Sequence, residues 1–259
     1  MEISSVPTSA FDRCLEVQRE LDEALASRVE PSQWGTQLYR GDFVRVTDLN
    51  VLVVHAHAGD VDAPALIEEA ERLQAFLPHR AVRIDDAEAG ARLAPEFAGR
   101  GWVVSRTALM ALRRHPDRPM DTSGVSEVPV ERLEAARSAA IRKTHRDLDV
   151  AAEAVRVGSL QHLYAPLRAY AALVGNEVAA YCLLRIREDG AKLVEVEALA
   201  RSQGHGVGRE VIWKAAATAR REKANPIFVE CELTGWATTA YRRLGFDEAG
   251  VVHRFVRPW

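Results

Sequence analysis

The 259-residue sequence lacks the features of a secreted, membrane or nucleic-acid-binding protein. No uninterrupted apolar run approaches the ~20 residues of a membrane-spanning helix. The start, MEISSVPTSAFDRCLE, lacks the basic-then-apolar order of a secretion signal. With 34 basic and 37 acidic residues, the formal net charge of −3 gives no general electrostatic reason to bind nucleic acid. We therefore expect a cytoplasmic protein with no membrane or nucleic-acid partner.

Cysteine is also scarce. Cys14, Cys182 and Cys231 are an odd number without CxxC spacing, which argues against a disulfide framework and a zinc site. His55 and His57 lie on one side of a strand end, but the HxHxDH order of a metallohydrolase is not completed after them. We expect free thiols and no metal.

The composition, 47% hydrophobic and 27% charged, is that of a globular protein with one large or two small domains. Residues 115–129 concentrate Pro, Gly, Ser and charge, so we divide the chain there into an N-terminal domain, 1–118, and a second domain, 125–259. The first domain is predicted to have an α/β fold. Its predicted elements are a helix at 11–26, a strand at 43–57, a helix at 63–76 and a strand at 81–85.

The second domain predicts an α/β (α+β) fold with an antiparallel meander in a mixed sheet flanked by helices. Gly175-Asn176 is a two-residue hairpin connection, because glycine supplies the positive φ of a tight turn. The predicted helices are 130–148, 151–163, 207–223 and 236–244, and the predicted strands are 167–174, 177–186, 192–199, 227–232 and 251–256.

Three glycines, Gly204, Gly206 and Gly208, fall between a predicted strand and a predicted helix. Such a loop lets backbone amides point outward together, and the helix N-terminus adds partial positive charge, so we expect an anion site for phosphate or pyrophosphate. A nucleoside-triphosphate loop is excluded because no Lys-Ser/Thr pair follows. A dinucleotide fold remains open, since Glu230 lies ~20 residues further on, but too few residues follow for a parallel sheet.

The run Gln203 to Gly208, QGHGVG, resembles the Q/R-x-x-G-x-G/A loop of the GCN5-related N-acetyltransferases, the GNAT superfamily. Ala237, Tyr241 and Gly245-Phe246 resemble that family's second motif, N-x-x-A-x-x-x-Y-x-x-x-G-F, with its spacing kept. One departure is Thr234, which stands where the family has Asn. The resemblance covers about 125–259, and the whole chain resembles two-domain actinobacterial members whose first half is a degenerate GNAT copy without the loop.

The resemblance implies acetyl-CoA as cosubstrate and no metal. The residues expected to hold coenzyme A are Ala198, Leu199, Ala200, Gln203, Gly204, His205, Gly206, Val207, Gly208, Arg209 and Thr234. It further implies direct attack of an amine on the thioester, with Tyr241 protonating the departing sulfur.

The general base is open among Glu197, Glu230 and Glu195, with water or no base as a further alternative. Glu195 and Glu197 lie two apart on a strand and therefore share a face. The acceptor would be an amine on a small molecule or peptide, and a homodimer is compatible with the sequence. The alternative function is a catalytically silent acyl-CoA-binding sensor or scaffold, which would need neither Tyr241 nor a nearby carboxylate.

Overall fold

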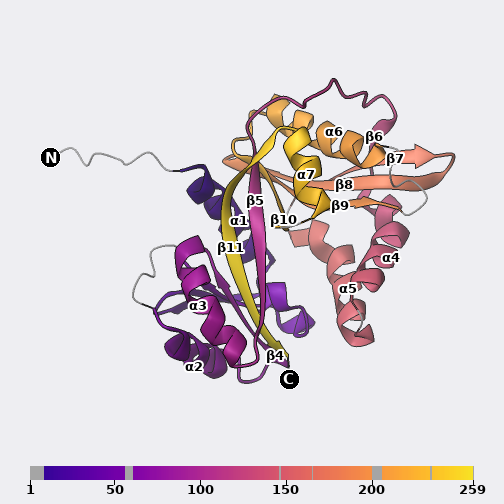
Figure 1. Cartoon of the computed structure of the whole chain (residues 1–259). Helices are drawn as coiled ribbons and strands as arrows, with labels where there is room; N and C mark the ends of the chain where they lie inside the picture. The colour runs from indigo at the N-terminus through magenta and orange to yellow at the C-terminus, as the bar shows by residue number, and fades with distance from the viewer. Residues whose placement is uncertain are drawn as a thin grey trace. The chain divides into compact units, whose positions relative to one another are not determined.

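The computed structural model describes residues 9–55, 61–145, 147–164, 166–199, 206–233 and 235–258. The chain forms two compact units that interleave along the sequence. The first unit takes the described parts of Met1–Glu20, Leu109–Val130 and Pro166–Gly250. The second unit takes the described parts of Leu21–Ala108, Glu131–Ala165 and Val251–Trp259. Each unit is an α/β structure built on a sheet (Figure 1).

The first unit contains a mixed sheet with the strand order β11-β5-β10-β9-β8-β7-β6. Strands β6 to β9 form an antiparallel meander, whereas β10 runs parallel to β9. Its elements, some shared with the second unit, are α1 (Ala10–Leu25), β5 (Val103–Leu112), β6 (Val125–Val128), β7 (Arg168–Val174), β8 (Glu177–Arg187), β9 (Gly190–Ala198), α6 (Val207–Arg221), β10 (Ile227–Glu232), α7 (Trp236–Arg243) and β11 (Phe246–Pro258).

Local sequence explains the main turns of this unit. Gly175, at φ +61°, makes the tight β7–β8 hairpin, and Gly245, at φ +92°, ends α7. Helix α6 buries one stripe of small and branched side chains against β7, β8 and β9. That stripe consists of Val211, Ile212, Ala215, Ala216 and Ala219.

The second unit has the strand order β1-β2-β3-β4-β11-β5. Its core includes Leu52, Leu66, Ile84 and Phe97, which join the strands to the two helices beside them. Its elements, some shared with the first unit, are β1 (Arg28–Ser32), β2 (Gly35–Tyr39), the 3-10 turns η1 (Gly41–Phe43) and η2 (Thr47–Leu49), β3 (Leu52–Val54), α2 (Ala63–Leu73), β4 (His79–Ile84), α3 (Ala87–Gly99), β5, η3 (Val130–Leu133), α4 (Glu134–Thr144), α5 (Leu148–Tyr164) and β11.

The two units repeat one order of elements. In the second unit β1, β2 and β3 are antiparallel neighbours, α2 follows, and β4 returns parallel to β3 before α3. In the first unit β7, β8 and β9 are antiparallel neighbours, α6 follows, and β10 returns parallel to β9 before α7. The N-terminal half therefore has the same topology as the C-terminal half, as expected of a structural copy.

The strand that ends each copy pairs within the other unit. Strand β11 follows α7 in sequence, yet it pairs antiparallel with β4, with His253 opposite Ile84. Strand β5 follows α3 in sequence and neighbours β10. Helix α5 also joins the second unit, where Arg45 forms ion pairs with Glu153 and Asp149. The division into linear domains 1–118 and 125–259 stays a prediction, and the compact units follow another partition.

The continuous strand expected at 43–57 is wrong. The described part of this segment contains η1, η2 and only the three-residue strand β3. Buried Asn50 explains the turns, because its Nδ2 donates to the carbonyls of Phe43 and Val46. Its Oδ1 accepts from the Arg40 backbone N–H. One amide side chain thus supplies partners that a strand neighbour would otherwise provide.

Candidate functional site

Strands β9 and β10 of the first unit begin as a parallel pair and then part. Three residue pairs are in register, and the last of them joins Leu193 to Val229. Both strands continue for several residues, β9 to Ala198 and β10 to Glu232. Along β9 the burial changes at the same point, from fully buried through Leu193 to half-buried beyond it. We call this opening between β9 and β10 the fork.

A bulge in β9 decides which backbone groups face the fork. Leu184 pairs with Leu193 but Leu183 pairs with Glu195, so Val194 is an extra residue. The Leu199 N–H donates to the Ala179 carbonyl of β8 at 2.9 Å. Because backbone groups alternate in direction along a strand, those of Val196 and Ala198 point toward the side of β10.

This geometry changes the expected pantetheine contacts. Leu199 directs its N–H to β8, so it is not available there as the sequence led us to expect. The sequence did not single out Val196, whose backbone groups face the side of β10, because a bulge shifts the alternation by one residue without a sequence signal of its own. Ala198 keeps its expected place at the fork.

Helix α6 starts at the end of β9 with an open N-terminus. Gly206 precedes it at φ +85° and makes no side-chain cap. Gly208 allows close approach, since a Cβ built there would lie 3.4 Å from the Ala198 Cβ. The first amides of a helix have no intrahelical acceptor, and the helix dipole adds partial positive charge there. Residues 206–209 can therefore hold an anion beside the fork.

Helix α2, in the corresponding place of the second unit, is closed. The Asp62 carboxylate accepts a hydrogen bond from the Ala65 N–H at 2.8 Å, and Pro64 lies in the first turn. The helix N-terminus thus carries its own anion, which also repels any phosphate. The contrast with α6 favours one anion site per chain.

Removing this cap has a measurable effect on stability. We expect Asp62→Ala to lower the free energy of unfolding by about 1 kcal/mol, because the Ala65 amide loses its acceptor. Asp62→Asn, which keeps a capping oxygen, should stay near the parent protein. Chemical denaturation measures both, and equal stability of Asp62→Ala and the parent would contradict the capping role.

Tyr241 lies on α7 with 7% of its surface exposed. Its ring packs edge-on against Phe246, with centroids 5.8 Å apart. Burial raises its pKa strongly, and the thiols of Cys182 and Cys231 add to the shift. Its hydroxyl has no hydrogen-bond partner among the described residues. The phenol is therefore neutral at pH 7, and no described residue accepts its proton in a hydrogen bond.

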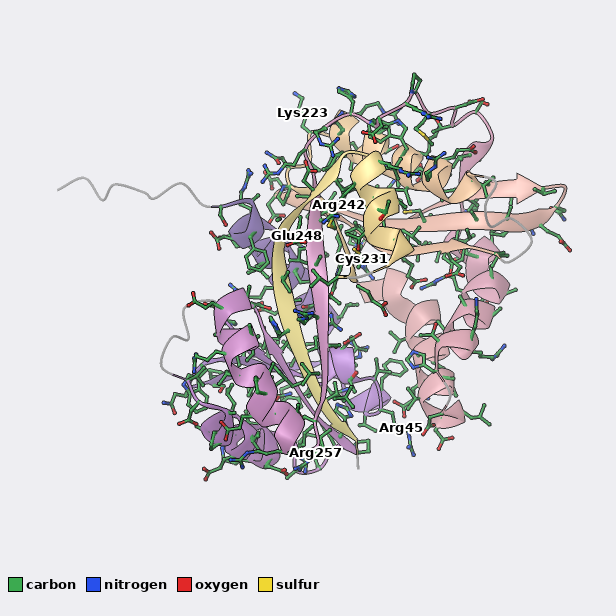
Figure 2. The ribbon with its side chains drawn as sticks, in the orientation of Figure 1. Arg45, Lys223, Cys231, Arg242, Glu248 and Arg257 are labelled. Atoms are coloured by element: carbon green, nitrogen blue, oxygen red, sulfur yellow. The ribbon has the colours of Figure 1, made fainter. Side chains whose placement is uncertain are left out.

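Cys231 is a core residue rather than a nucleophile. It lies on β10 beside Arg242 and Glu248 (Figure 2) and is 9% exposed. Burial raises the pKa of its thiol, and Glu230 acts in the same direction. A thiol with a raised pKa is a poor source of thiolate.

The three candidate carboxylates point to one face of the sheet. Glu195 and Glu197 share a face because they lie two apart past the bulge. On β8, Leu183 lies opposite Glu195 and Arg185 lies opposite Lys192. Leu183 and Arg185 are two residues apart and point to one face, so Lys192 shares the face of Glu195. Glu230 lies on the same face, because it forms an ion pair with Lys192.

Tyr241 lies on the opposite face of the sheet. The two thiols that influence its pKa belong to Cys182 and Cys231, which are chain neighbours of Leu183 and Glu230. Adjacent residues in a strand point to opposite faces. The phenol and the carboxylates therefore lie on the two sides of the sheet, and the fork separates β9 from β10 between them.

The three carboxylates differ in their surroundings. Glu230 Oε2 lies 3.1 Å from the Lys192 Nζ, and both side chains are mostly buried. Glu195 and Glu197 are half-buried on β9 beyond the bulge. Glu230 is thus held in an ion pair with a described residue, Lys192.

The remaining expected cofactor residues, Ala200, Gln203, Gly204, His205 and Thr234, lie outside the described residues.

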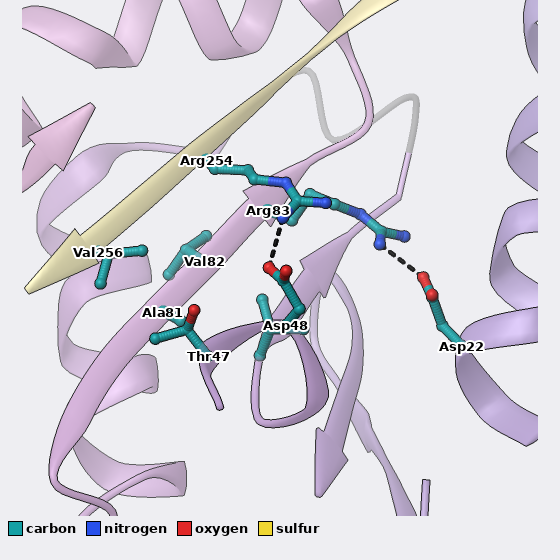
Figure 3. A pocket seen from close by; sticks show the side chains of 9 residues that line it. Asp22, Thr47, Asp48, Ala81, Val82, Arg83, Arg254 and Val256 are labelled. Atoms are coloured by element: carbon teal, nitrogen blue, oxygen red, sulfur yellow. Dashed lines mark hydrogen bonds and ion pairs between the residues drawn. The ribbon is translucent and has the colours of Figure 1, made fainter. Parts of the chain in front are cut away.

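A pocket in the second unit does not compete with this site. Its charged lining is paired internally, Arg83 with Asp22 at 2.6 Å and Arg254 with Asp48 (Figure 3). Its volume of about 30 Å³ is well below the roughly 300 to 1,000 Å³ that is usual for ligand pockets. It is too small for a nucleotide cofactor.

The described residues contain neither a membrane-spanning helix nor a metal-binding cluster. No described helix is long and apolar enough to cross a membrane. No cluster of three or more His, Cys, Asp or Glu side chains in the described ranges is arranged to hold a metal ion.

The fold and site define an α/β protein in which a helix N-terminus without a side-chain cap lies beside a forked sheet. Residues 134–246 match the family model described as "Acetyltransferase (GNAT) family". The matched segment, which spans α4 to the start of β11, is similar to this family.

Solved structures share the fold at low sequence identity. A GCN5-related N-acetyltransferase from Kribbella flavida is 18% identical, with 97% of this chain and 96% of that chain covered and a TM-score of 0.62. A functionally unknown conserved protein from Staphylococcus epidermidis is 10% identical, with 90% and 94% covered and a TM-score of 0.68. A GCN5-related N-acetyltransferase from Sphaerobacter thermophilus is 14% identical, with 94% and 85% covered and a TM-score of 0.58. No curated protein sequence matches the chain.

Proposed function

We propose that the protein transfers an acetyl or short acyl group from acetyl-CoA to a primary amine of a small molecule or peptide by direct attack. The family performs acyl transfer in general. The observation that carries the proposal is the fork, which opens between β9 and β10 directly before the open N-terminus of α6. The protein would work in the cytoplasm, and a homodimer is compatible with the proposal.

The residues present suit this cosubstrate. The amides of residues 206–208 would hold the pyrophosphate, with Arg209 close by, and Gln203, Gly204 and His205 would complete the loop. The backbone groups of Val196 and Ala198 would hydrogen-bond the pantetheine amides at the edge of β9. Bound acetyl-CoA supplies a thioester carbonyl that an amine can attack. Tyr241 would donate its proton to the sulfur, which its raised pKa and free hydroxyl permit.

Glu197 is the proposed general base. It is half-buried on the carboxylate face, and no ion pair to it is present among the described residues. Glu230 is paired with Lys192, which holds its charge in place. Glu195 lies nearer the bulge and is the second choice. The base removes a proton from the acceptor ammonium, a step that a lysine-like amine with pKa ~10.4 needs more than an α-amine does.

The role of Glu197 predicts a pH-dependent loss. We expect Glu197→Gln to lower kcat/KM by about 10²-fold at pH 7, and the deficit should shrink toward pH 10, where the amine is already neutral. Glu195→Gln is the matched control and should lose much less. Initial rates from pH 7 to pH 10 measure both, and a constant ratio of parent to Glu197→Gln rates would remove Glu197 as the base.

A silent acyl-CoA-binding module is the alternative function. It would bind acetyl-CoA equally well but would not need the unpartnered Tyr241 hydroxyl. A panel of primary amines, assayed by the free thiol released from acetyl-CoA, distinguishes the two. Thiol release that depends on an amine supports the enzyme. Tight binding of acetyl-CoA without release by any amine supports the silent module.

A further inference from the structure

We propose that Lys192 and Gln18 are positioning residues of the acyl transfer, which hold the Glu230 carboxylate at the point where the fork opens. This inference rests on the proposed function. It adds a residue of α1 to the site, although α1 lies far outside the region that matches the family model, 134–246.

The three side chains form one buried network in the first unit. The Lys192 Nζ donates to Gln18 Oε1 and to Glu230 Oε2, the latter at 3.1 Å. Gln18 is 7% exposed and Lys192 is 9% exposed. The ammonium also lies 6.0 Å from the centroid of the Phe228 ring, on the same face of β10 as Glu230. Three elements, α1, β9 and β10, thus meet at one ammonium group.

The position of this network coincides with the fork. Lys192 lies opposite Phe228, one residue before the last pair of the parallel ladder, and Glu230 is the first residue of β10 beyond that pair. The ion pair therefore joins the two strands just where their backbone hydrogen bonds stop. It fixes where β10 turns away from β9.

Stability alone does not explain such a pair. A buried ion pair pays a large desolvation cost, and well-packed apolar side chains often replace it without loss. The start of β10 is already anchored by three buried apolar side chains, those of Ile227, Phe228 and Val229. A third partner from α1, 174 residues away in sequence, holds the ammonium in one place. This arrangement holds the carboxylate in one direction.

The fixed carboxylate has a use on the face it shares with Glu195 and Glu197. The Glu230 carboxylate, whose charge Lys192 balances, can orient the acceptor amine by accepting a hydrogen bond from it, while Glu197 takes the proton. The two carboxylates then have separate tasks. Lys192 and Gln18 act only through Glu230 and touch neither substrate.

A double-mutant cycle tests this coupling in the full chain. The variants are Lys192→Met, Glu230→Gln and the two combined, assayed with acetyl-CoA and the primary amine that the parent uses best. We expect each single variant to lower kcat by about 10- to 100-fold, with KM for acetyl-CoA within about threefold of the parent. The combined variant should lose no more than the worse single variant, because both remove one arrangement.

Two further variants separate positioning from folding. Gln18→Leu leaves the ion pair in place and removes only its support from α1, so kcat should fall about 3- to 10-fold. If Lys192→Met does not fold, as judged by coenzyme A binding, this variant decides the question. Glu20→Gln is the matched control, since it breaks the exposed pair of Glu20 with Arg187, which also ties α1 to β8. It should leave kcat unchanged.

Three results would overturn the proposal. The first is a kcat loss in the combined variant equal to the product of the two single losses, and the second is a parent-like kcat in Gln18→Leu. The third is a kcat loss in Glu20→Gln as large as that in Gln18→Leu. The failure of the proposed function looks different: the parent itself would then release no thiol with any amine. A parent that is active, with variants that are parent-like, refutes only the positioning role.

Discussion

Replacing Gly206 by Glu is expected to abolish the rise in melting temperature that acetyl-CoA produces in the parent protein. Gly206 is the residue before α6, and the helix amides behind it are the proposed pyrophosphate seat. A carboxylate placed there repels the ligand and caps the helix as Asp62 caps α2. At 100 times the dissociation constant, bound ligand stabilises the parent by about 2.7 kcal/mol, all of which the variant should lose.

The control separates charge from backbone strain. Gly206 has φ +85°, a conformation that most side chains avoid but asparagine tolerates. Among the described residues, a Cβ there meets only the Arg209 guanidinium, at 3.8 Å. Gly206→Asn should therefore keep most of the thermal shift. An equal response of Gly206→Glu and the parent to acetyl-CoA would show that α6 does not bind the cofactor.

Tyr241→Phe is expected to lower kcat by about 10²-fold or more while the affinity for acetyl-CoA stays near that of the parent. The substitution keeps the ring that packs against Phe246 and removes only the hydroxyl. That hydroxyl has no partner among the described residues, so its loss leaves no buried group unsatisfied. The whole effect should appear in turnover.

Tyr170→Phe is the matched control for this variant. Tyr170 is a buried tyrosine of the same unit on β7, and its hydroxyl faces Glu127 at 3.4 Å. Its loss should change kcat by less than about twofold. Equal turnover in the parent and Tyr241→Phe would remove Tyr241 from the mechanism.

The raised pKa of Tyr241 predicts the alkaline pH dependence. An unperturbed phenol ionises near pH 10, and burial moves this ionisation to higher pH. The proton donor is therefore retained across the alkaline range, and kcat should not fall up to pH 10 through loss of this proton. A fall with a midpoint near pH 8 that disappears in Tyr241→Phe would contradict the assignment.

Much of the first unit could be predicted because its signals are local. A hairpin glycine, an apolar helical stripe and a glycine that ends a helix each act within a few residues, as Gly175, α6 and Gly245 show. The proposed anion site rests on the same logic, since a glycine-rich segment between a strand and a helix is visible in the residues themselves.

Long-range contacts could not be predicted in this way. The Val194 bulge depends on how β8 and β9 pair, and it turned Leu199 away from the fork. The pairing of β11 with β4 and the reach of Gln18 to Lys192 join residues more than 150 positions apart. Such contacts leave no periodic signal, because each depends on the tertiary arrangement of distant segments.

Asn50 shows how one residue can override a pattern. The run around it is rich in branched apolar residues and predicts a strand. Its buried side chain instead bonds three backbone groups and folds the segment into turns. Polar residues inside an apolar run are thus a reason to doubt the strand prediction.

Calorimetric titration of the full chain with coenzyme A tests the central claim most directly. The second unit closes its corresponding helix with Asp62, whereas α6 in the first unit is open. We therefore expect binding with a stoichiometry near one, and we expect Gly206→Glu to remove it. A stoichiometry near two, or no binding at all, would contradict it.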